Sequence, residues 1–488
     1  MTDVVLRSVQ GRGVLAATIL GSGMAQLDGT VVNVALPRIG RDLHAGLTSL
    51  QWTVNAYTLT LSGLLLLGGS LGDRLGRRRI FVLGVIWFTA ASIGCALAPT
   101  ATVLIAMRAV QGVGAALLTP GSLAILESVF IPEDRSAAVG AWSGLGGVAT
   151  AIGPVLGGLL VGVAPWGWRI VFVLNVPLAI AVIALSRRYI PETRDEHAAG
   201  RVDITGVVLA ASGLAALVYA LTAASSGWKA STVVLLVVGV GLLAGFLIWQ
   251  ARVANPLMPL GLFASRQFSA ANATTFVVYA ALSGALFLLP VQLQRVSGFS
   301  PVAAGSSLLP VTAVMLVLSA RMGRVAQRIG PRLPMTVGPL IAAAGLALMA
   351  QIDSSSTYVT GVLPAALIFA VGLSCTVAPL TATVLAAAPA HQVGIASAVN
   401  NDVARVAGLL AVAVLPGLAG ITSHAYNHPS ELSAGFHTAV LIAAALCAFG
   451  GVLSALFISN HLRDTEEPHD HAIDCAACPV GAPHARPR

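Results

Sequence analysis

Long apolar segments, separated by short polar or basic segments, occupy almost the whole chain. A helix that crosses a bilayer needs about 20 mostly apolar residues. Fourteen segments meet this requirement, at 14–35, 50–71, 80–98, 102–126, 136–162, 169–186, 204–223, 231–250, 268–290, 304–321, 335–351, 358–380, 395–421 and 436–458. The pattern predicts an all-α membrane protein with about fourteen spans.

The cationic residues between these segments are distributed unequally over the two sides of the predicted membrane. With the N-terminus in the cytoplasm, 20 of the 27 Lys and Arg residues fall on the inner side and 5 on the outer side. Cytoplasmic segments of membrane proteins carry such an excess of positive charge. We therefore expect both termini in the cytoplasm, with Arg108 and Arg405 left inside spans.

The composition agrees with a lipid environment. The chain is 56% hydrophobic and only 9% charged, whereas a soluble domain has about 25% charged residues. We attribute the formal net charge of +8 to membrane topology and expect no nucleic-acid partner. We therefore expect the chain to lie in a membrane.

The chain contains a coarse internal repeat. The basic, glycine-containing segment GSLGDRLGRRR (69–79) has a degraded relative in RMGRVAQRIGPR (321–332). Repeated halves are a common construction of secondary transporters. The expected division is a six-helix bundle (1–190), an inserted helix pair (191–260), a second six-helix bundle (261–460) and a polar tail (461–488).

Two opposite charges fall at similar depths in the first half of the chain. At 1.5 Å per residue, Asp28 lies about 21 Å from the cytoplasmic end of its span, and Arg108 about 9 Å below the outer end of its own. Charged groups inside a membrane are costly and commonly functional. We predict that the two face each other and couple transport to protons. The alternative is a permanent ion pair that only fixes the packing.

Further polar residues lie at membrane depth. Asp402 and Arg405 are three residues apart and are expected to pair along one helix face, in a structural role. Neutral polar residues either line a wet substrate cavity or join helices by hydrogen bonds. The cavity candidates are Gln26, Asn33, Asn55, Gln111, Asn175 and Asn400.

The fifth span contains closely spaced glycines around a proline. Gly153 and Gly157 share one helix face, Gly158 follows, and Pro154 removes one backbone hydrogen bond. Close packing with a bend suits a helix that rocks against a neighbour. Simple tight packing is the alternative.

With these motifs, the chain resembles the fourteen-span drug:proton antiporters of the major facilitator superfamily, the QacA-like and EmrB-like group, over residues 13–460. GSLGDRLGRRRI (69–80) is similar to the signature loop of the superfamily, and the resemblance implies a conformational latch between the halves. The corresponding residues are Gly69, Gly72, Asp73, Arg74, Gly76 and Arg77. Asp73 is expected to act at a helix N-terminus across the interface, near Gly394.

Other motifs carry the same resemblance. LDGTVVNVALPRI (27–39) is similar to the first-span motif of the branch, and LIAMRAVQGVGAA (104–116) to the fourth-span motif, whose arginine is associated with proton transfer. AIGPVLGG (151–158) resembles the antiporter motif of the fifth span, which implies export. The tenth span lacks the acidic residue that some members use for divalent cations.

The resulting hypothesis is proton-coupled efflux of small lipophilic or cationic drugs by a monomer that needs no cofactor. The sequence contains no GxxxxGK[ST] phosphate loop, and no enzymatic activity is expected. One alternative is a dedicated exporter of a single endogenous metabolite, antibiotic, lipid or siderophore. Alternatives from other classes are a non-transporting receptor or scaffold with the same fold, and a membrane enzyme.

The polar tail contains one weak metal motif. His469, His471, Cys475 and Cys478 have donor atoms suited to zinc or copper. We favour a free tail without metal, because a lone tail lacks surrounding groups that orient the ligands.

Overall fold

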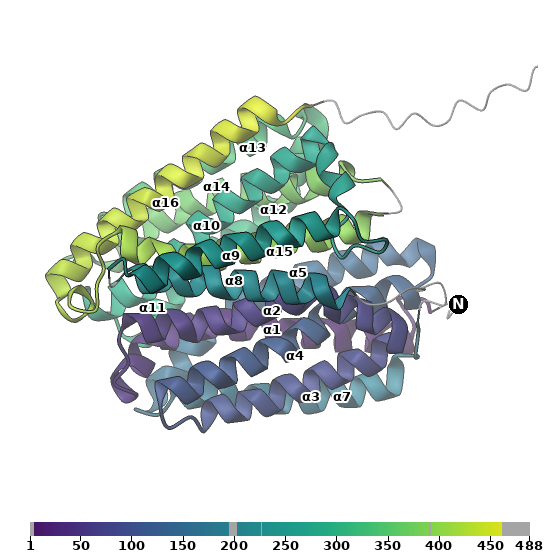
Figure 1. Ribbon diagram of the computed structural model, residues 1–488, viewed down its shortest axis with the longest axis horizontal. Helices are drawn as coiled ribbons and strands as arrows, with labels where there is room; N and C mark the ends of the chain where they lie inside the picture. Colours follow the sequence, from purple (N-terminus) through teal and green to yellow (C-terminus); the bar gives the residue numbers. More distant parts are fainter. Residues whose placement is uncertain (1–3, 195–202, 226, 390–391, 461–488) are drawn as a thin grey trace, which may run out of the picture.

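The protein is a bundle of long helices (Figure 1). The computed structural model describes residues 4–194, 203–225, 227–389 and 392–460. Helices occur at all fourteen predicted segments: α1 (Val9–Asp42), α2 (Leu47–Leu75), α3 (Arg77–Ala96), α4 (Ala101–Val129), α5 (Pro132–Val163), α6 (Trp168–Val173), α7 (Asn175–Tyr189), α8 (Ile204–Ala224), α9 (Ala230–Gln250), α10 (Arg266–Arg295), α11 (Pro301–Ser306), α12 (Leu309–Ile329), α13 (Arg332–Met349), α14 (Leu363–Ala386), α15 (Val393–Leu418) and α16 (Pro429–Phe457). Short helical turns lie at Leu260–Ala264 (η1), Tyr358–Val362 (η2) and Ala425–Asn427 (η4).

Helix α1 differs from the other spanning helices in its polarity. Over the described residues, 13 helices are long and apolar enough to cross a membrane, and α1 is not among them. It is 34 residues long, but it contains Gln26, Asp28 and Asn33 besides many small residues. Most of its middle is buried against other helices. Since such a helix meets little lipid, it tolerates polar groups that an outer helix does not.

The helices before and after the inserted pair pack in the same pattern. Among the first seven helices, α4 packs against α2 and α3, while α1 packs against α5 and α7. Among the last seven, α14 packs against α12 and α13, while α10 packs against α15 and α16. Figure 1 shows the two sets as a purple-to-blue layer and a green-to-yellow layer. This is the arrangement that a repeated six-helix unit produces.

Helices α8 and α9 lie along the seam between the two layers (Figure 1). Helix α8 packs against α2 and α15, one helix from each set, whereas α9 packs mainly against α8. The side chains of Val234 and Val237 in α9 are 60% and 64% exposed, as expected where lipid covers the surface. Asp203 ties the pair together, because it accepts hydrogen bonds from Trp249 and Gln250.

The two sets of helices meet at the end of the bundle opposite to the N-terminus. There Gln294 Nε2 donates to Val34 O at 2.9 Å, and Gln51 Nε2 donates to Val412 O at 2.7 Å. At the other end of α5, a Cβ added to Gly140 or Gly144 would meet no atom within 4 Å. Hydrogen bonds therefore join the two sets at that end, whereas Gly140 and Gly144 face open space.

Candidate functional site

The structure brings Asp28 of α1 and Arg108 of α4 together in a fully buried ion pair. Each residue is 1% exposed, and Arg108 Nη1 donates to Asp28 Oδ2. Arg108 has further acceptors, because Nε donates to Thr53 O at 3.0 Å and Nη1 to Gln111 Oε1 at 2.6 Å. Buried charges are stable only when they are paired and hydrogen-bonded, as this pair is.

Neutral side chains from three helices complete the surroundings of the carboxylate. Gln111 Nε2 donates to Asp28 Oδ1 at 2.9 Å and to Ser92 Oγ at 2.8 Å. Asn175 Nδ2 donates to the same two oxygens at 3.3 and 3.2 Å. Helices α1, α3, α4 and α7 thus converge on one polar cluster inside an apolar bundle. The hydrogen bonds among these side chains fix the positions of the members of the cluster.

Aromatic rings close the cluster around the arginine. Arg108 Cζ lies 4.2 Å from the centre of the Tyr57 ring and 5.9 Å from that of Phe172. The Tyr57 hydroxyl donates to Ala25 O at 3.1 Å, which holds the ring in place. A guanidinium over an aromatic face is stabilised most where water is excluded. Arg108 therefore keeps several favourable contacts that do not involve Asp28.

The six predicted cavity residues fall into separate groups. Gln111 and Asn175 belong to the Asp28 cluster. Gln26 accepts a hydrogen bond from Thr150 of α5 at 2.9 Å. Asn400 of α15 donates to Asn272 and Thr275 of α10, so it joins two helices of the last set. Asn33 Oδ1, Asn55 Oδ1 and Asn175 Oδ1 are all buried without a hydrogen-bond partner, and Asn55 differs in that its Nδ2 has none either.

The predicted latch loop forms the sharp junction between α2 and α3. Gly76 stands at the junction with φ +109°, which favours glycine, and a side chain there would collide with Glu192. Asp73 pairs with Arg77 at 2.8 Å, and Arg77 N donates to Thr193 O at 2.8 Å. The expected interaction of Asp73 with the start of α15, near Gly394, stays a prediction. In the part of the chain that the structure describes, its partner is Arg77, on its own side of the seam.

The glycine motif of α5 lies where helices from both sets touch. A Cβ at Gly153 would stand 2.0 Å from Thr30 Oγ1 of α1. A Cβ at Gly158 would stand 2.5 Å from Pro301 O of α11, and one at Gly305 would stand 2.1 Å from Pro154 O. Gly157 also approaches α1, at Val31. Backbones can come this close only where side chains are absent.

Asp402 of α15 does not form the ion pair expected with Arg405. The Asp402 Oδ1 atom is buried without a hydrogen-bond partner, and so is Ser62 Oγ of the neighbouring helix α2. Three residues along a helix bring side chains to the same face only if both rotamers allow it. Here the carboxylate is directed to the seam between α2 and α15 instead.

Sequence reasoning overlooked Ser92, Tyr57, Thr53 and Phe172 as members of the cluster. Thr53 contributes only its backbone carbonyl, which no sequence pattern reveals. Ser92 is one small hydroxyl in an apolar helix, where serine usually bonds to its own backbone. The metal motif predicted at His469, His471, Cys475 and Cys478 lies outside the described residues.

Comparisons with known proteins agree with this architecture. A family model described as Major Facilitator Superfamily matches residues 18–412. The puromycin resistance protein pur8 of Streptomyces alboniger is 36% identical over 468 residues, covering 93% of this chain and 92% of that protein. The tetracenomycin C resistance and export protein of Streptomyces glaucescens is 36% identical over 403 residues, with coverages of 82% and 74%.

A solved structure with the same fold is a bacterial homologue of the human lysosomal transporter Spinster, in an inward-facing and occupied conformation. It aligns with a TM-score of 0.67 at 17% identity, covering 93% of this chain and 98% of that chain. The likeness establishes the fold of the helical bundle.

Proposed function

The chain belongs to the major facilitator superfamily, and from this premise we propose that it exports drugs or antibiotics in exchange for protons. It is a membrane transporter, not an enzyme. We assign it to the fourteen-span drug:proton antiporter branch, as a monomer in the inner membrane of a bacterial cell with both termini in the cytoplasm. The drug-resistance names of its relatives support export.

The observation that carries the proton coupling is the construction of the Asp28 site. Asp28 is the carboxylate of a fully buried cluster, and its cationic partner Arg108 has other acceptors at Thr53 and Gln111. When Asp28 takes up a proton, Arg108 keeps these two hydrogen bonds and its contact with the Tyr57 ring. The cluster can therefore change its charge without leaving the guanidinium unpartnered.

We propose that the proton on Asp28 changes how α1 packs on α4 and α7, and that the two bundles then rock about the seam. The hydrogen bonds across the seam at its proposed outer end, from Gln294 to Val34 and from Gln51 to Val412, support an inward-open resting state. The close contacts of Gly158 and Gly305 would act as the pivot, with the loop at Asp73 as the latch. Alternating exposure of a central site is the general mechanism of such repeated folds.

The proton gradient is sufficient as the energy source. One charge crossing the membrane potential gains about 2.3 kcal/mol per 100 mV. At roughly 150 mV this permits a gradient of about a few hundred-fold for each proton exchanged. The unpartnered amides of Asn33 and Asn55 are the proposed polar contacts for substrate, since their buried oxygens lack donors.

A dedicated exporter of one antibiotic is the second candidate. The specific support is that two relatives are named for a single compound each, puromycin and tetracenomycin C. Growth assays with a chemically diverse set of compounds distinguish a dedicated exporter from a drug pump of broad specificity. Resistance to one compound class supports the dedicated exporter, whereas resistance to several unrelated classes supports the drug pump.

The decisive experiment measures efflux from proteoliposomes under an imposed proton gradient. We expect Asp28→Asn to abolish proton-driven efflux while substrate still binds. Asp353→Asn is the matched control, because Asp353 lies on an exposed loop where hydrogen bonds from Ser355 and Ser356 hold the pKa of its carboxyl below the usual value. If the Asp28→Asn variant still couples efflux to protons, the assignment of Asp28 as the proton-coupling residue is refuted. Absence of any substrate-dependent proton flux in the wild type would favour a receptor or scaffold.

A further inference from the structure

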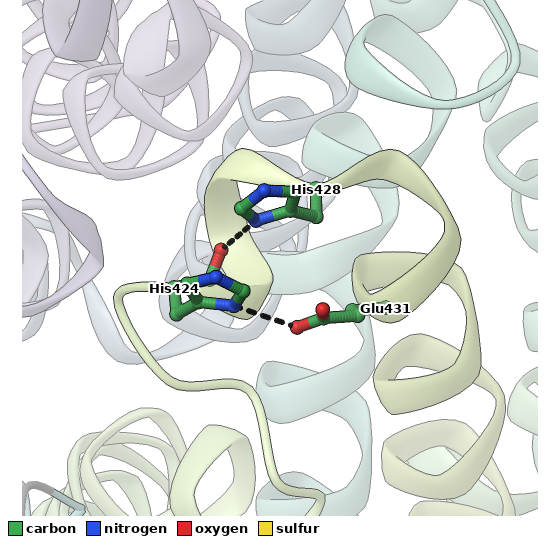
Figure 2. Close-up of side chains that lie close together, drawn as sticks. All are labelled: His424, His428 and Glu431. Carbon is green, nitrogen blue, oxygen red and sulfur yellow. Dashed lines mark hydrogen bonds and ion pairs between the residues drawn. The ribbon is translucent and has the colours of Figure 1, made fainter.

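Three side chains with metal-binding atoms gather on the loop between α15 and α16 (Figure 2). His424 and His428 flank the short turn η4, and Glu431 lies in the first turn of α16. The imidazole rings of the two histidines are stacked with their centres 4.0 Å apart. One ligand atom from each of the three residues lies within 4.8 Å of the other two.

The hydrogen bonds of the cluster determine which nitrogens are free. His428 Nδ1 lies 2.9 Å from the carbonyl oxygen of His424. A carbonyl oxygen can only accept, so this Nδ1 carries the hydrogen. His424 Nδ1 lies 3.0 Å from Glu431 Oε2, and an ionised carboxylate also only accepts. In the neutral form of each ring the lone pair is therefore on Nε2, the atom that can bind a metal.

We propose that His424, His428 and Glu431 form a binding site for a divalent transition metal, Zn²⁺ foremost. Two imidazoles and one carboxylate are a donor set that zinc accepts, with room for water as a further ligand. Because an imidazole lone pair lies in the plane of its ring, metal binding requires the stacked rings to turn toward each other. All three side chains are exposed, so they have room for this rotation.

The position of the site suggests what the metal does. Tyr426 is the middle residue of η4. It is 2% exposed and packs where the two bundles meet. Arg295 of α10 places its guanidinium 4.1 Å from the Tyr426 ring and donates to Tyr426 O at 3.1 Å. Gly40 of α1 lies against the Tyr426 hydroxyl.

Tyr426 thus links the outer ends of α1 and α10. A metal joining His424 to His428 would hold η4 in this position. On the proposed function, we infer that Zn²⁺ at the outer face restrains the opening of the outer seam and slows export.

The binding test uses the full chain in detergent, titrated with ZnCl₂ by calorimetry. Because the tail has its own possible ligands, His469, His471, Cys475 and Cys478 are replaced throughout. We expect one zinc per chain, and we expect Glu431→Gln to weaken binding by about 10–100-fold and His428→Ala by at least as much. His44→Ala, an exposed histidine on another loop, is the matched control and should bind as the parent does. Equal binding by parent and His428→Ala, or no binding by the parent, would overturn the site.

The transport test adds ZnCl₂ to the face that carries this loop, in proteoliposomes with a proton gradient. We expect Zn²⁺ to slow efflux by the parent protein and to leave the His424→Ala/His428→Ala variant unaffected. If Zn²⁺ slows efflux by both proteins equally, or by neither, the proposal that Zn²⁺ restrains the opening of the outer seam is overturned. Binding is measured without transport, so a failure of proton-coupled export would not be mistaken for failure of the metal site.

Discussion

The two bundles each place a carboxylate within the membrane, but they surround it very differently. Asp28 has a cationic partner and two amide donors, all buried with it. Asp402 has an Oδ1 atom without any hydrogen-bond partner in the described residues, beside the equally unpartnered Ser62 hydroxyl at the seam. The full cluster compensates the cost of burying the Asp28 charge, whereas little compensates it at Asp402. Position in a span is thus a poor guide to what a buried acid does.

The largest effect is expected when the Asp28 pair is broken. Arg108→Leu leaves the carboxylate buried without its cation, so we expect the free energy of unfolding to fall by about 3–5 kcal/mol. Unfolding of the purified protein in denaturing detergent measures the change. Arg252→Leu, at an exposed position, is the control and should differ little from the wild type. If the two variants have the same free energy of unfolding, the Asp28–Arg108 pair stabilises the fold no more than an exposed charge does.

A matched pair of serine variants tests the surroundings of the two acids. Ser92→Ala removes the oxygen that accepts from Gln111 and Asn175. Leaving buried donors unsatisfied costs about 1–3 kcal/mol. Ser62→Ala removes a hydroxyl that lies beside Asp402 but makes no hydrogen bond of good geometry, and we expect a change below about 1 kcal/mol. The same unfolding assay applies, and an equal loss in both variants would contradict the contrast.

The smallest effect is expected at the second acid itself. Asp402→Asn exchanges a carboxylate for an amide of the same shape, and no ion pair is lost. We expect the free energy of unfolding to change by less than about 1 kcal/mol, whereas Asp28→Asn should cost more because Arg108 loses its counter-charge. A large loss from Asp402→Asn would mean that Arg405 stabilises the carboxylate from a distance, despite the absence of a direct pair.

The sequence predicted the spanning helices well because lipid imposes a simple rule of length and polarity. Helix α1 lies at a predicted span although its hydropathy is lower than that of the other spanning helices in the described residues, because other helices cover most of its surface. Counting residues from the ends of the spans placed Asp28 and Arg108 at similar depths in the membrane, since each residue of a straight helix adds a fixed distance along its axis. The same counting cannot give rotation about the helix axis. For this reason Asp402 was expected beside Arg405, and the contribution of Ser92 was missed.

The placement of α8 across the seam has a consequence for molecules dissolved in the bilayer. This helix touches α2 on one side and α15 on the other, and so occupies the crevice that acyl chains would otherwise fill. If the bundles rock as proposed, α8 slides along one of these two neighbours and keeps the crevice filled. On the opposite flank no helix lies between the bundles in the described residues, and α5 packs directly on α11. The proposed motion therefore has a sliding contact on one flank and a direct backbone contact on the other.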